Sequence, residues 1–252
     1  MKVDMARFFT IPILLFGITS YAMLTNASVT MTNTRVIFQA ENKDQTLQFH
    51  NKGNTPYIVQ VWLDKGNDKS TPDTADAPFI VTPQVFRINP NTGQTARLLY
   101  IGDNQHPKDR ESIFYLNFRQ IPAISQSTAD QNKLIMTFNS RFKVFYRPKT
   151  IVGNVEAMPQ KWTFNLQQNA KGSTVTVHNP TGYYANLTAG TLKVKQQSYS
   201  IDPKSVAMIA PYSSATWPLP KKVTVDQDSV LSVTYVNDYG AIARQDIPVQ
   251  QP

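Results

Sequence analysis

Residues Lys133–Pro148 read KLIMTFNSRFKVFYRP, and large apolar side chains alternate with other ones through the first half of this segment. Successive side chains of an extended chain point to opposite faces, so Leu134, Met136 and Phe138 share one face. An apolar strand at the edge of a sheet invites pairing with another chain unless charge or proline blocks it. The pattern therefore fits two structures: a core strand of a β-domain, or an edge strand that binds a partner.

The second half of the segment, SRFKVFYRPK, places Arg141, Lys143 and Arg147 among aromatic residues. Such interleaving occurs in sites for single-stranded nucleic acid. It also suits a half-buried strand whose cations pair with carboxylates inside the fold. No nucleic-acid-binding motif accompanies it, and the chain carries an export signal. We therefore predict no nucleic-acid partner.

The first 27 residues have the composition of a secretory signal peptide. Lys2 and Arg7 precede the apolar run FFTIPILLFGI, and small residues follow. This run is shorter than the roughly 20 residues that a membrane-spanning helix needs. The sequence TNA suits a cleavage site and predicts a mature chain that begins at Ser28, while a cut after Ala22 is the alternative. No later segment is long and apolar enough to span a bilayer, which predicts a soluble, exported protein.

Short apolar runs recur about every ten residues and predict an all-β fold. Examples are PYIVQVWL, TARLLYIG, STVTVHNP and SVLSVTYVND, and Gly, Pro and Asn turns separate them. A break within FYRPKTIVGN divides the chain into residues 28–149 and 150–252, each long enough for one β-sandwich. The chain has no cysteine, so two apolar cores must hold it together. Its net charge of +8 suits a solubilising surface or a partner with acidic groups.

Sequence motifs of catalysis and metal binding are missing. The histidines His50, His106 and His178 are scattered, and none has the spacing of a zinc site. There is no G-x-S-x-G elbow, G-x-G-x-x-G turn or P-loop. We predict a non-enzymatic protein without cofactor or metal. An exported enzyme on β-sandwich domains stays open as a rival, because a carboxylate pair has no sequence signature.

Six segments follow one another over nearly the whole mature chain: NTPYIVQVWL, FIVTPQVFRINP, DRESIFYLNFRQIP, RFKVFYRP, HNPTGYYANL and VNDYG. Their number, order and spacing resemble the periplasmic pilus-assembly chaperones, the PapD-like family. The resemblance implies two immunoglobulin-like β-sandwich domains at an angle, with a cleft between them. It implies a periplasmic chaperone that lends a strand to fimbrial subunits and delivers them to an outer-membrane usher.

The resemblance also implies roles for single residues. Leu134, Met136 and Phe138 would be the donor-strand side chains that fill the groove of an incomplete subunit. Arg35, in NTRVIF, and Lys143 would anchor the C-terminal carboxylate of that subunit. Structural pairing with an internal acid is the alternative for these two cations.

A further implied set is structural. Glu111, Arg147 and Asp238 would form an ion cluster between the domains, with the planar guanidinium bridging two carboxylates. The tripeptide VTP at Val81–Pro83 is a candidate cis-proline turn.

Two questions stay open at this stage. Lys143 has an odd number, whereas the donor-strand residues have even ones, so an unbroken strand would direct them to opposite faces. A bulge between Asn139 and Phe142 would restore a common face, and a cleft reached from the other face would make one unnecessary. The second question is the rival class, a structural fimbrial subunit or another exported immunoglobulin-like binding protein. A subunit would lack a strand and often carry a disulfide.

Overall fold

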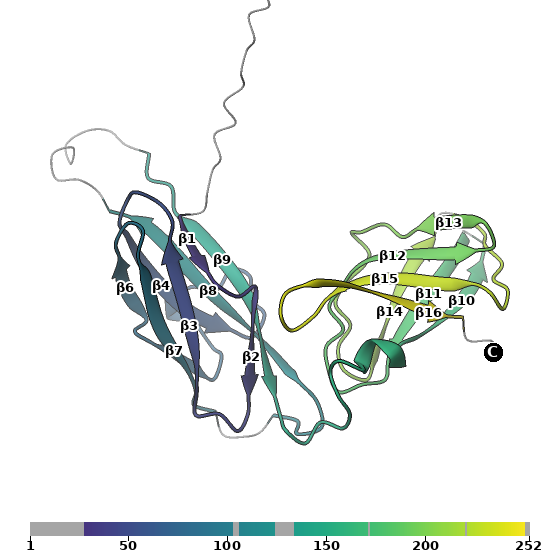
Figure 1. The fold of residues 1–252 in the computed structure, drawn as a ribbon, viewed down its shortest axis with the longest axis horizontal. Coiled ribbons are helices and arrows are strands. Elements are labelled where there is room, and N and C mark those ends of the chain that lie inside the picture. Colours follow the sequence, from purple (N-terminus) through teal and green to yellow (C-terminus); the bar gives the residue numbers. More distant parts are fainter. Residues whose placement is uncertain (1–27, 103–105, 124–133, 171, 220, 250–252) are drawn as a thin grey trace, which may run out of the picture.

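The protein consists of two β-sandwiches that meet at an angle (Figure 1). The first sandwich has a sheet in the order β1-β3-β7-β5 and a second sheet in the order β2-β9-β8-β4-β6. The second sandwich has sheets in the orders β10-β11-β14 and β13-β12-β15-β16. The computed structural model describes residues 28–102, 106–123, 134–170, 172–219 and 221–249. The expected signal peptide, residues 1–27, lies outside them.

The strands are short, as the spacing of the turns predicts. Those of the first sandwich are β1 (Val29–Met31), β2 (Arg35–Gln39), β3 (Asp44–Asn51), β4 (Tyr57–Asp64), β5 (Phe79–Thr82), β6 (Val85–Ile88), β7 (Gly93–Tyr100), β8 (Ser112–Pro122) and β9 (Phe138–Arg147). Those of the second are β10 (Thr163–Asn169), β11 (Gly172–Asn179), β12 (Leu187–Val194), β13 (Gln197–Ser200), β14 (Ser213–Leu219), β15 (Val230–Val236) and β16 (Ile242–Pro248). The helical elements of the described chain are two 3-10 turns, η1 (Pro72–Thr74) and η3 (Met158–Lys161). No described helix is long and apolar enough to cross a lipid bilayer.

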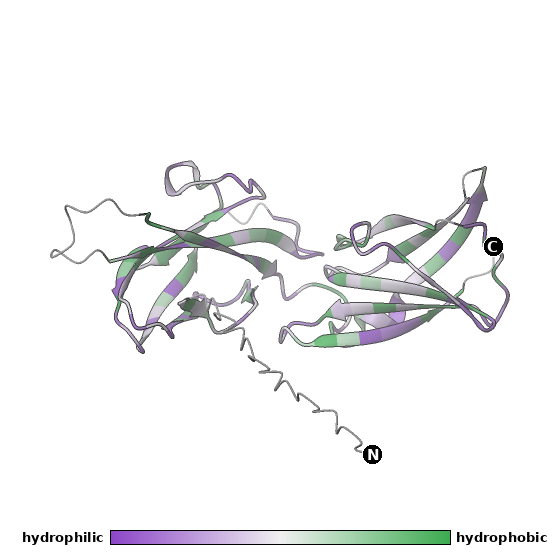
Figure 2. Cartoon of the chain, turned by 90° about the horizontal axis from the view of Figure 1, so that it is seen from above, coloured by the Kyte–Doolittle hydropathy of each residue, from purple (hydrophilic) through white to green (hydrophobic). Residues whose placement is uncertain are grey.

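Each sandwich has its own hydrophobic core, because alternate side chains of each strand point inward. Figure 2 shows this alternation of apolar and polar residues along the strands. Aromatic packing dominates the first core, where the rings of Phe38 and Phe79 meet edge to face with centroids 5.3 Å apart. Trp217 is fully buried at the centre of the second core. The Thr82–Pro83 bond between β5 and β6 is cis.

Strand β9 lies between β2 and β8 for only half of its length. It pairs antiparallel with β8 from Phe138 to Tyr146, without a shift in register. Strand β2 pairs parallel with β9, but only from Lys143 to Arg147. In the described part of the chain, nothing pairs with Phe138–Phe142 on that side. We call this stretch the open edge.

The unbroken register answers the question of a bulge. Even-numbered residues of β9, among them Phe142, Val144 and Tyr146, face the first core. Odd-numbered residues, Lys143 among them, face away from that core. Lys143 and Phe138 therefore point to opposite sides of one continuous strand. Of the two alternatives that the sequence left open, the bulge is absent and a site on the other face of β9 remains.

The segment before the open edge departs from the expected strand. Residues 134–137 adopt no regular structure, and β9 begins at Phe138. The ladder between β8 and β9 ends at the pair of Gln120 and Phe138, although β8 itself continues to Pro122, so no strand pairing holds residues 134–137 extended. Lys133 lies outside the described residues.

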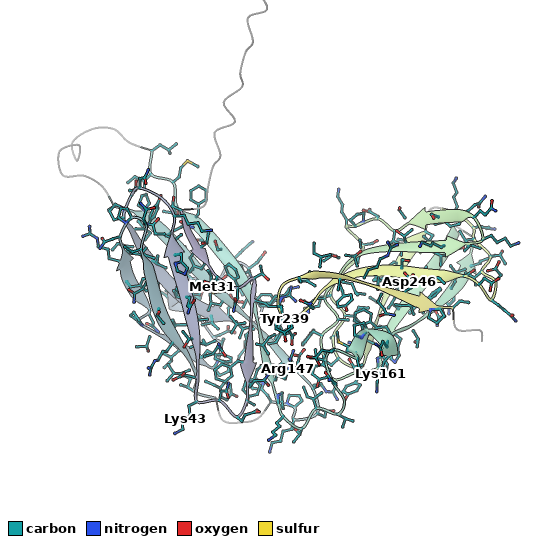
Figure 3. The ribbon with its side chains drawn as sticks, in the orientation of Figure 1. Met31, Lys43, Arg147, Lys161, Tyr239 and Asp246 are labelled. Atoms are coloured by element: carbon teal, nitrogen blue, oxygen red, sulfur yellow. The ribbon has the colours of Figure 1, made fainter. Side chains whose placement is uncertain are left out.

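The second sandwich reaches the first through the hairpin between β15 and β16, which extends toward β2 in Figure 1. Tyr239, at the tip of this hairpin, lies close to Arg147 at the junction of the two sandwiches (Figure 3). Gly240 in the same turn has a φ of 80°. A Cβ at this position would lie 2.4 Å from the hydroxyl oxygen of Thr34. Glycine is thus required both for the turn and for the close approach of the two domains.

Candidate functional site

Arg35 and Lys143 lie side by side at the end of the open edge. Arg35 is the first residue of β2, and it pairs directly with Lys143 in the parallel β2–β9 ladder. Residues paired in this way direct their side chains to the same face of a sheet. The Arg35 side chain is 8% exposed, and that of Lys143 is half-buried. We call these two residues the anchor pair.

Among the described residues, neither cation of the anchor pair has an acidic partner within bonding distance. Arg35 donates from Nη1 to the carbonyl oxygen of Val236 at 3.0 Å. Lys143 donates from Nζ to Oδ1 of Asn186 at 3.2 Å. The buried Nε of Arg35 has no hydrogen-bond partner. The ion pairs of the described residues include neither cation, so no acid of this part of the chain supports the alternative of internal pairing.

The electrostatics of the anchor pair favour an added anion. Burial lowers the pKa of Lys143, and the neighbouring charge of Arg35 lowers it further. Burial also lowers the pKa of Arg35, although the more distant Asp238 partly opposes this. Two like charges that are partly removed from water gain from a carboxylate between them, since each charge-assisted hydrogen bond is worth about 1.5–3 kcal/mol.

The apolar strip, which comprises Leu134, Met136 and Phe138, is exposed to solvent. The exposed fractions of these side chains are 88%, 60% and 51%. Phe138 continues the core-facing side of β9, beyond the point where the core ends. The first interpretation of this segment, a core strand, is therefore wrong for the described free chain.

The anchor pair and the open edge define how a bound strand would run. A chain that hydrogen-bonds to Phe138–Phe142 is stopped by β2, which occupies the same side of β9 from Lys143 onward. The end of that chain then lies beside the anchor pair. If this end is a C-terminal carboxylate, the bound strand runs parallel to β9, in line with β2.

Glu111, Arg147 and Asp238 are in contact between the two sandwiches, and we call them the junction cluster. Arg147 donates from Nε to Glu111 Oε1 at 2.7 Å, and from Nη1 and Nη2 to the Asp238 carboxylate at 2.6 and 3.0 Å. The other oxygen of Glu111 accepts the backbone amide of Tyr184 at 2.8 Å. Burial opposes the charge of Arg147, but its bonds to Asp238 and Glu111 raise its pKa. Burial also raises the pKa of Glu111.

Comparison with known proteins gives the same architecture over almost the whole described chain. Residues 28–152 match the family "Pili and flagellar-assembly chaperone, PapD N-terminal domain". Residues 157–247 match "Pili assembly chaperone PapD, C-terminal domain". The chain belongs to the PapD family of pilus-assembly chaperones. The sequence resemblance is thus confirmed, and the rival interpretation as a structural fimbrial subunit is rejected.

Individual members of the family are similar over most of their length. A probable fimbrial chaperone, YadV of Escherichia coli K12, is 38% identical over 191 residues, which are 74% of this chain and 76% of the relative. The chaperone protein FimB/FhaD of Bordetella pertussis is 34% identical over 228 residues, 88% of each chain. The crystal structure of a YadV chaperone superposes with a TM-score of 0.73 at 30% identity, covering 88% of this chain and all of the other.

The sequence did not reveal one further polar network of the chaperone, which lies on the same face of β9 as Lys143. Arg141 donates from Nη1 and Nη2 to both carboxylate oxygens of Asp64, at 2.6 and 2.7 Å. Asn117 and Ser70 donate to Asp64 as well. Burial alone would raise the pKa of Asp64, but the bonds from Arg141, Ser70, the Gly66 amide and Asn117 lower it to about 2. An aspartate at the end of the apolar strand YIVQVWLD is the one signal that the sequence offered.

The described residues contain no cluster of His, Cys, Asp or Glu side chains that could hold a metal ion. The polar residues of this face instead tie β9 to its neighbours, on either side of the anchor pair.

Replacing Arg147 by alanine leaves two carboxylates close together, one of them buried. Removing one partner of a buried ion pair costs about 3–5 kcal/mol. We expect the free energy of unfolding of the chaperone to fall by that amount, which thermal and denaturant melts measure. Arg244→Ala is the control, because the Arg244–Asp246 pair is exposed and its loss costs less than about 1 kcal/mol. Equal melting of the two variants would contradict a stabilising role of the junction cluster.

Asp64→Asn tests the second network through its pH dependence. The pKa of Asp64 is about 2 in the folded chain against an ordinary 3.8, so its stabilisation is complete above about pH 4 and is lost as the pH falls to about 2. At neutral pH we expect the variant to lose about 2–3 kcal/mol of unfolding free energy. The difference from wild type should shrink between about pH 4 and pH 2. Asp73→Asn, at an exposed site, should show neither effect.

Proposed function

We propose that this chaperone binds fimbrial subunits in the periplasm by lending them residues Leu134–Phe138 and the open edge of β9, while the anchor pair holds the subunit's C-terminal carboxylate. One observation carries the proposal: an exposed apolar strip leads along an unpaired strand edge to two partly desolvated cations that have no acidic partner. Delivery to an outer-membrane usher follows from the same role. We also propose that residues 1–27 are a signal peptide that exports the chain, and that the two domains span residues 28–149 and 150–252.

The apolar strip supplies binding energy. Burying each of its three side chains is worth about 1.5–3 kcal/mol, or roughly 5–9 kcal/mol together, before the cost of ordering residues 134–137. This segment has no regular structure in the free chain, so it becomes a strand only against a partner. Strand addition to an exposed sheet edge is a known mode of peptide recognition.

The anchor pair supplies the register. A slip of one residue along a strand would turn every inserted side chain to the wrong face. Fixing the carboxylate between Arg35 and Lys143 fixes the position of every residue that precedes it. The apolar strip and the anchor pair therefore act on one strand from its two ends: the strip selects an incomplete apolar groove, and the anchor pair selects a free chain end.

Lys143→Met separates binding from stability. Because the lysine charge is partly buried with no acidic partner among the described residues, replacing it with an apolar side chain should leave the free energy of unfolding unchanged or raise it. The same variant should fail to retain a fimbrial subunit that co-purifies with the wild type from periplasm. Lys193→Met, at an exposed strand position, is the matched control and should keep binding. A Lys143→Met protein that still holds subunits would refute the anchor assignment.

Met136→Glu tests the apolar strip. Met136 is 60% exposed in the free chain, so a carboxylate there should leave the melting temperature near that of wild type. Subunit binding should be lost, because the charge would have to enter an apolar groove unpaired. Melts and co-purification measure the two effects.

Two controls define the face that the strip uses. In an extended strand the side chain of residue 135 points to the face opposite that of Met136. Ile135→Glu should therefore weaken binding less than Met136→Glu. Ile242→Glu, at a 77% exposed position of the second sandwich, should change nothing. Unfolding of Met136→Glu, or equal loss of binding in all three variants, would contradict the donor-strand assignment.

A further inference from the structure

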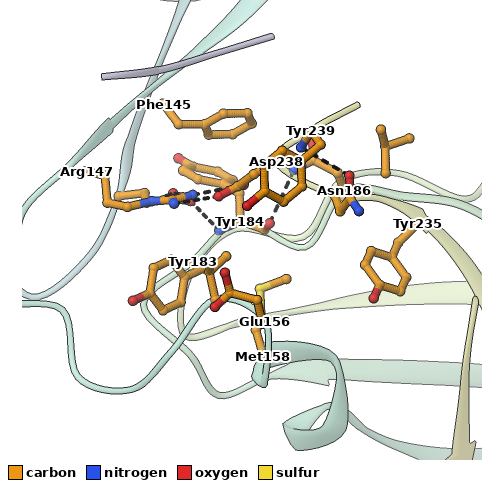
Figure 4. A pocket seen from close by; sticks show the side chains of 14 residues that line it. Phe145, Arg147, Glu156, Met158, Tyr183, Tyr184, Asn186, Tyr235, Asp238 and Tyr239 are labelled. Carbon is orange, nitrogen blue, oxygen red and sulfur yellow. Dashed lines mark hydrogen bonds and ion pairs between the residues drawn. The ribbon is translucent and has the colours of Figure 1, made fainter. Parts of the chain in front are cut away.

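A cavity of about 150 Å³ lies between the two sandwiches (Figure 4). Its walls are mainly aromatic and apolar, and they come from β9 on one side and from the second sandwich on the other: Phe145, Met158, Tyr183, Tyr184 and Tyr235. Phe145 and Tyr184 contact each other across the junction with ring centroids 5.6 Å apart. The junction cluster forms one end of the cavity.

Two lining residues connect this cavity to the anchor pair. Asn186 accepts the hydrogen bond from Lys143, and Val236 accepts the one from Arg35. Phe145 follows Lys143 by two residues, so its side chain lies on the same face of β9. If both cations hold a carboxylate, it lies beside these two acceptors and hence near the cavity wall, which the cations themselves do not line.

We propose that this cavity receives the side chain of the last residue of the bound subunit, and that this residue is apolar or aromatic. The inference rests on the proposed function, since it takes the carboxylate to lie at the anchor pair. The carboxylate carbon and the Cβ of a C-terminal residue are bonded to the same Cα, so that side chain is the nearest one to the cavity. A cavity of about 150 Å³ with apolar walls can hold benzene, and the aromatic part of this wall is formed by Phe145, Tyr183, Tyr184 and Tyr235, apart from the charged residues at its end and rim. The volume between the sandwiches thus matches one phenyl-sized group.

The charges around the cavity disfavour an acidic side chain there. Glu111 and Asp238 share the single cation of Arg147. Glu156, on the rim, takes part in no ion pair of the described residues. The cavity therefore carries an excess of negative charge, in contrast to the anchor pair near its wall. The main-chain carboxylate of the last residue therefore binds the two cations, and its neutral side chain binds in the cavity.

The test uses the mature chaperone and four fluorescently labelled peptides that share one alternating apolar–polar sequence. Three have a free carboxylate and end in phenylalanine, alanine or glutamate, and the fourth ends in phenylalanine amide. Fluorescence anisotropy measures the dissociation constants. We expect the phenylalanine acid to bind tightest, the alanine and glutamate acids at least about tenfold more weakly, and the amide to lose binding.

The outcomes separate the inference from the function beneath it. Equal binding of the phenylalanine and alanine acids, with the amide still inactive, would overturn the cavity assignment and leave the anchor pair intact. An amide that binds as well as the acid, or a failure of every free acid to bind, would overturn both.

A charge-reversal variant locates the effect. Glu156→Lys should raise the affinity for the glutamate peptide relative to the phenylalanine peptide, because the rim charge then becomes attractive. Glu41→Lys changes the net charge by the same amount at an exposed position of the first sandwich, and it should leave that ratio unchanged. An equal change of the ratio in both variants would show that overall charge, and no local contact in the cavity, sets the preference.

Discussion

The position at which β2 begins governs the rest of this structure. Strand β2 starts at Arg35, opposite Lys143, and covers β9 only from there to its end. The half of β9 that precedes this point keeps a free edge, and two cations stand where the free edge stops. If β2 began a few residues earlier, it would pair with Phe138–Phe142 and close the open edge. If β2 began later, Arg35 would no longer be paired with Lys143. The parallel pairing of five residues thus creates both the place for a partner strand and the site that receives its end.

The anchor pair is costly for the free protein, and neighbouring ion pairs offset this cost. Three basic residues lie on one face of β9, at Arg141, Lys143 and Arg147. The first is bound by Asp64 and the last by the junction cluster, while the middle one has an amide partner only. The paired cations tie β9 to β4 and to the second sandwich. They fix the backbone on both sides of a charge that is left unpaired, and stored electrostatic strain of this kind is typical of binding sites.

The sequence predicts local features well and long-range pairings poorly. Turn residues and period-two alternation predicted two β-sandwiches, whereas the shared face of the apolar strip stays a prediction, because residues 134–137 form no strand in the free chain. The contact of Arg147 with Glu111 and Asp238 came from a family resemblance, because these residues are far apart in the chain. The sequence left open whether β9 contains a bulge, because the odd and even residue numbers show only that two side chains point apart. The structure shows an unbroken strand. The partner of Asp64 was not found, because no local pattern links it to Arg141, 77 positions away.

In the proposed function, the apolar strip and the anchor pair use opposite faces of β9. A partner must therefore be a domain that lacks one strand and must also have an accessible C-terminal carboxylate. The apolar strip continues the core-facing side of β9, so it is buried only by a partner that offers an open groove on that side. The anchor pair faces the other way, toward the second sandwich, where it donates to Val236 and Asn186. In the proposed function, it is a terminal carboxylate reaching the junction that satisfies these two cations. A complete β-domain with its final strand in place fills its own groove and has no need of the strip. An arbitrary C-terminal tail offers a carboxylate but no groove. A complete domain thus leaves the apolar strip exposed, and a C-terminal tail without a groove does so as well. Only an incomplete domain with a free carboxyl end can bind both the strip and the anchor pair. On the proposed function, the geometry of β9 therefore selects an incomplete domain with a free carboxyl end, and the cavity at the junction adds a preference for its last side chain.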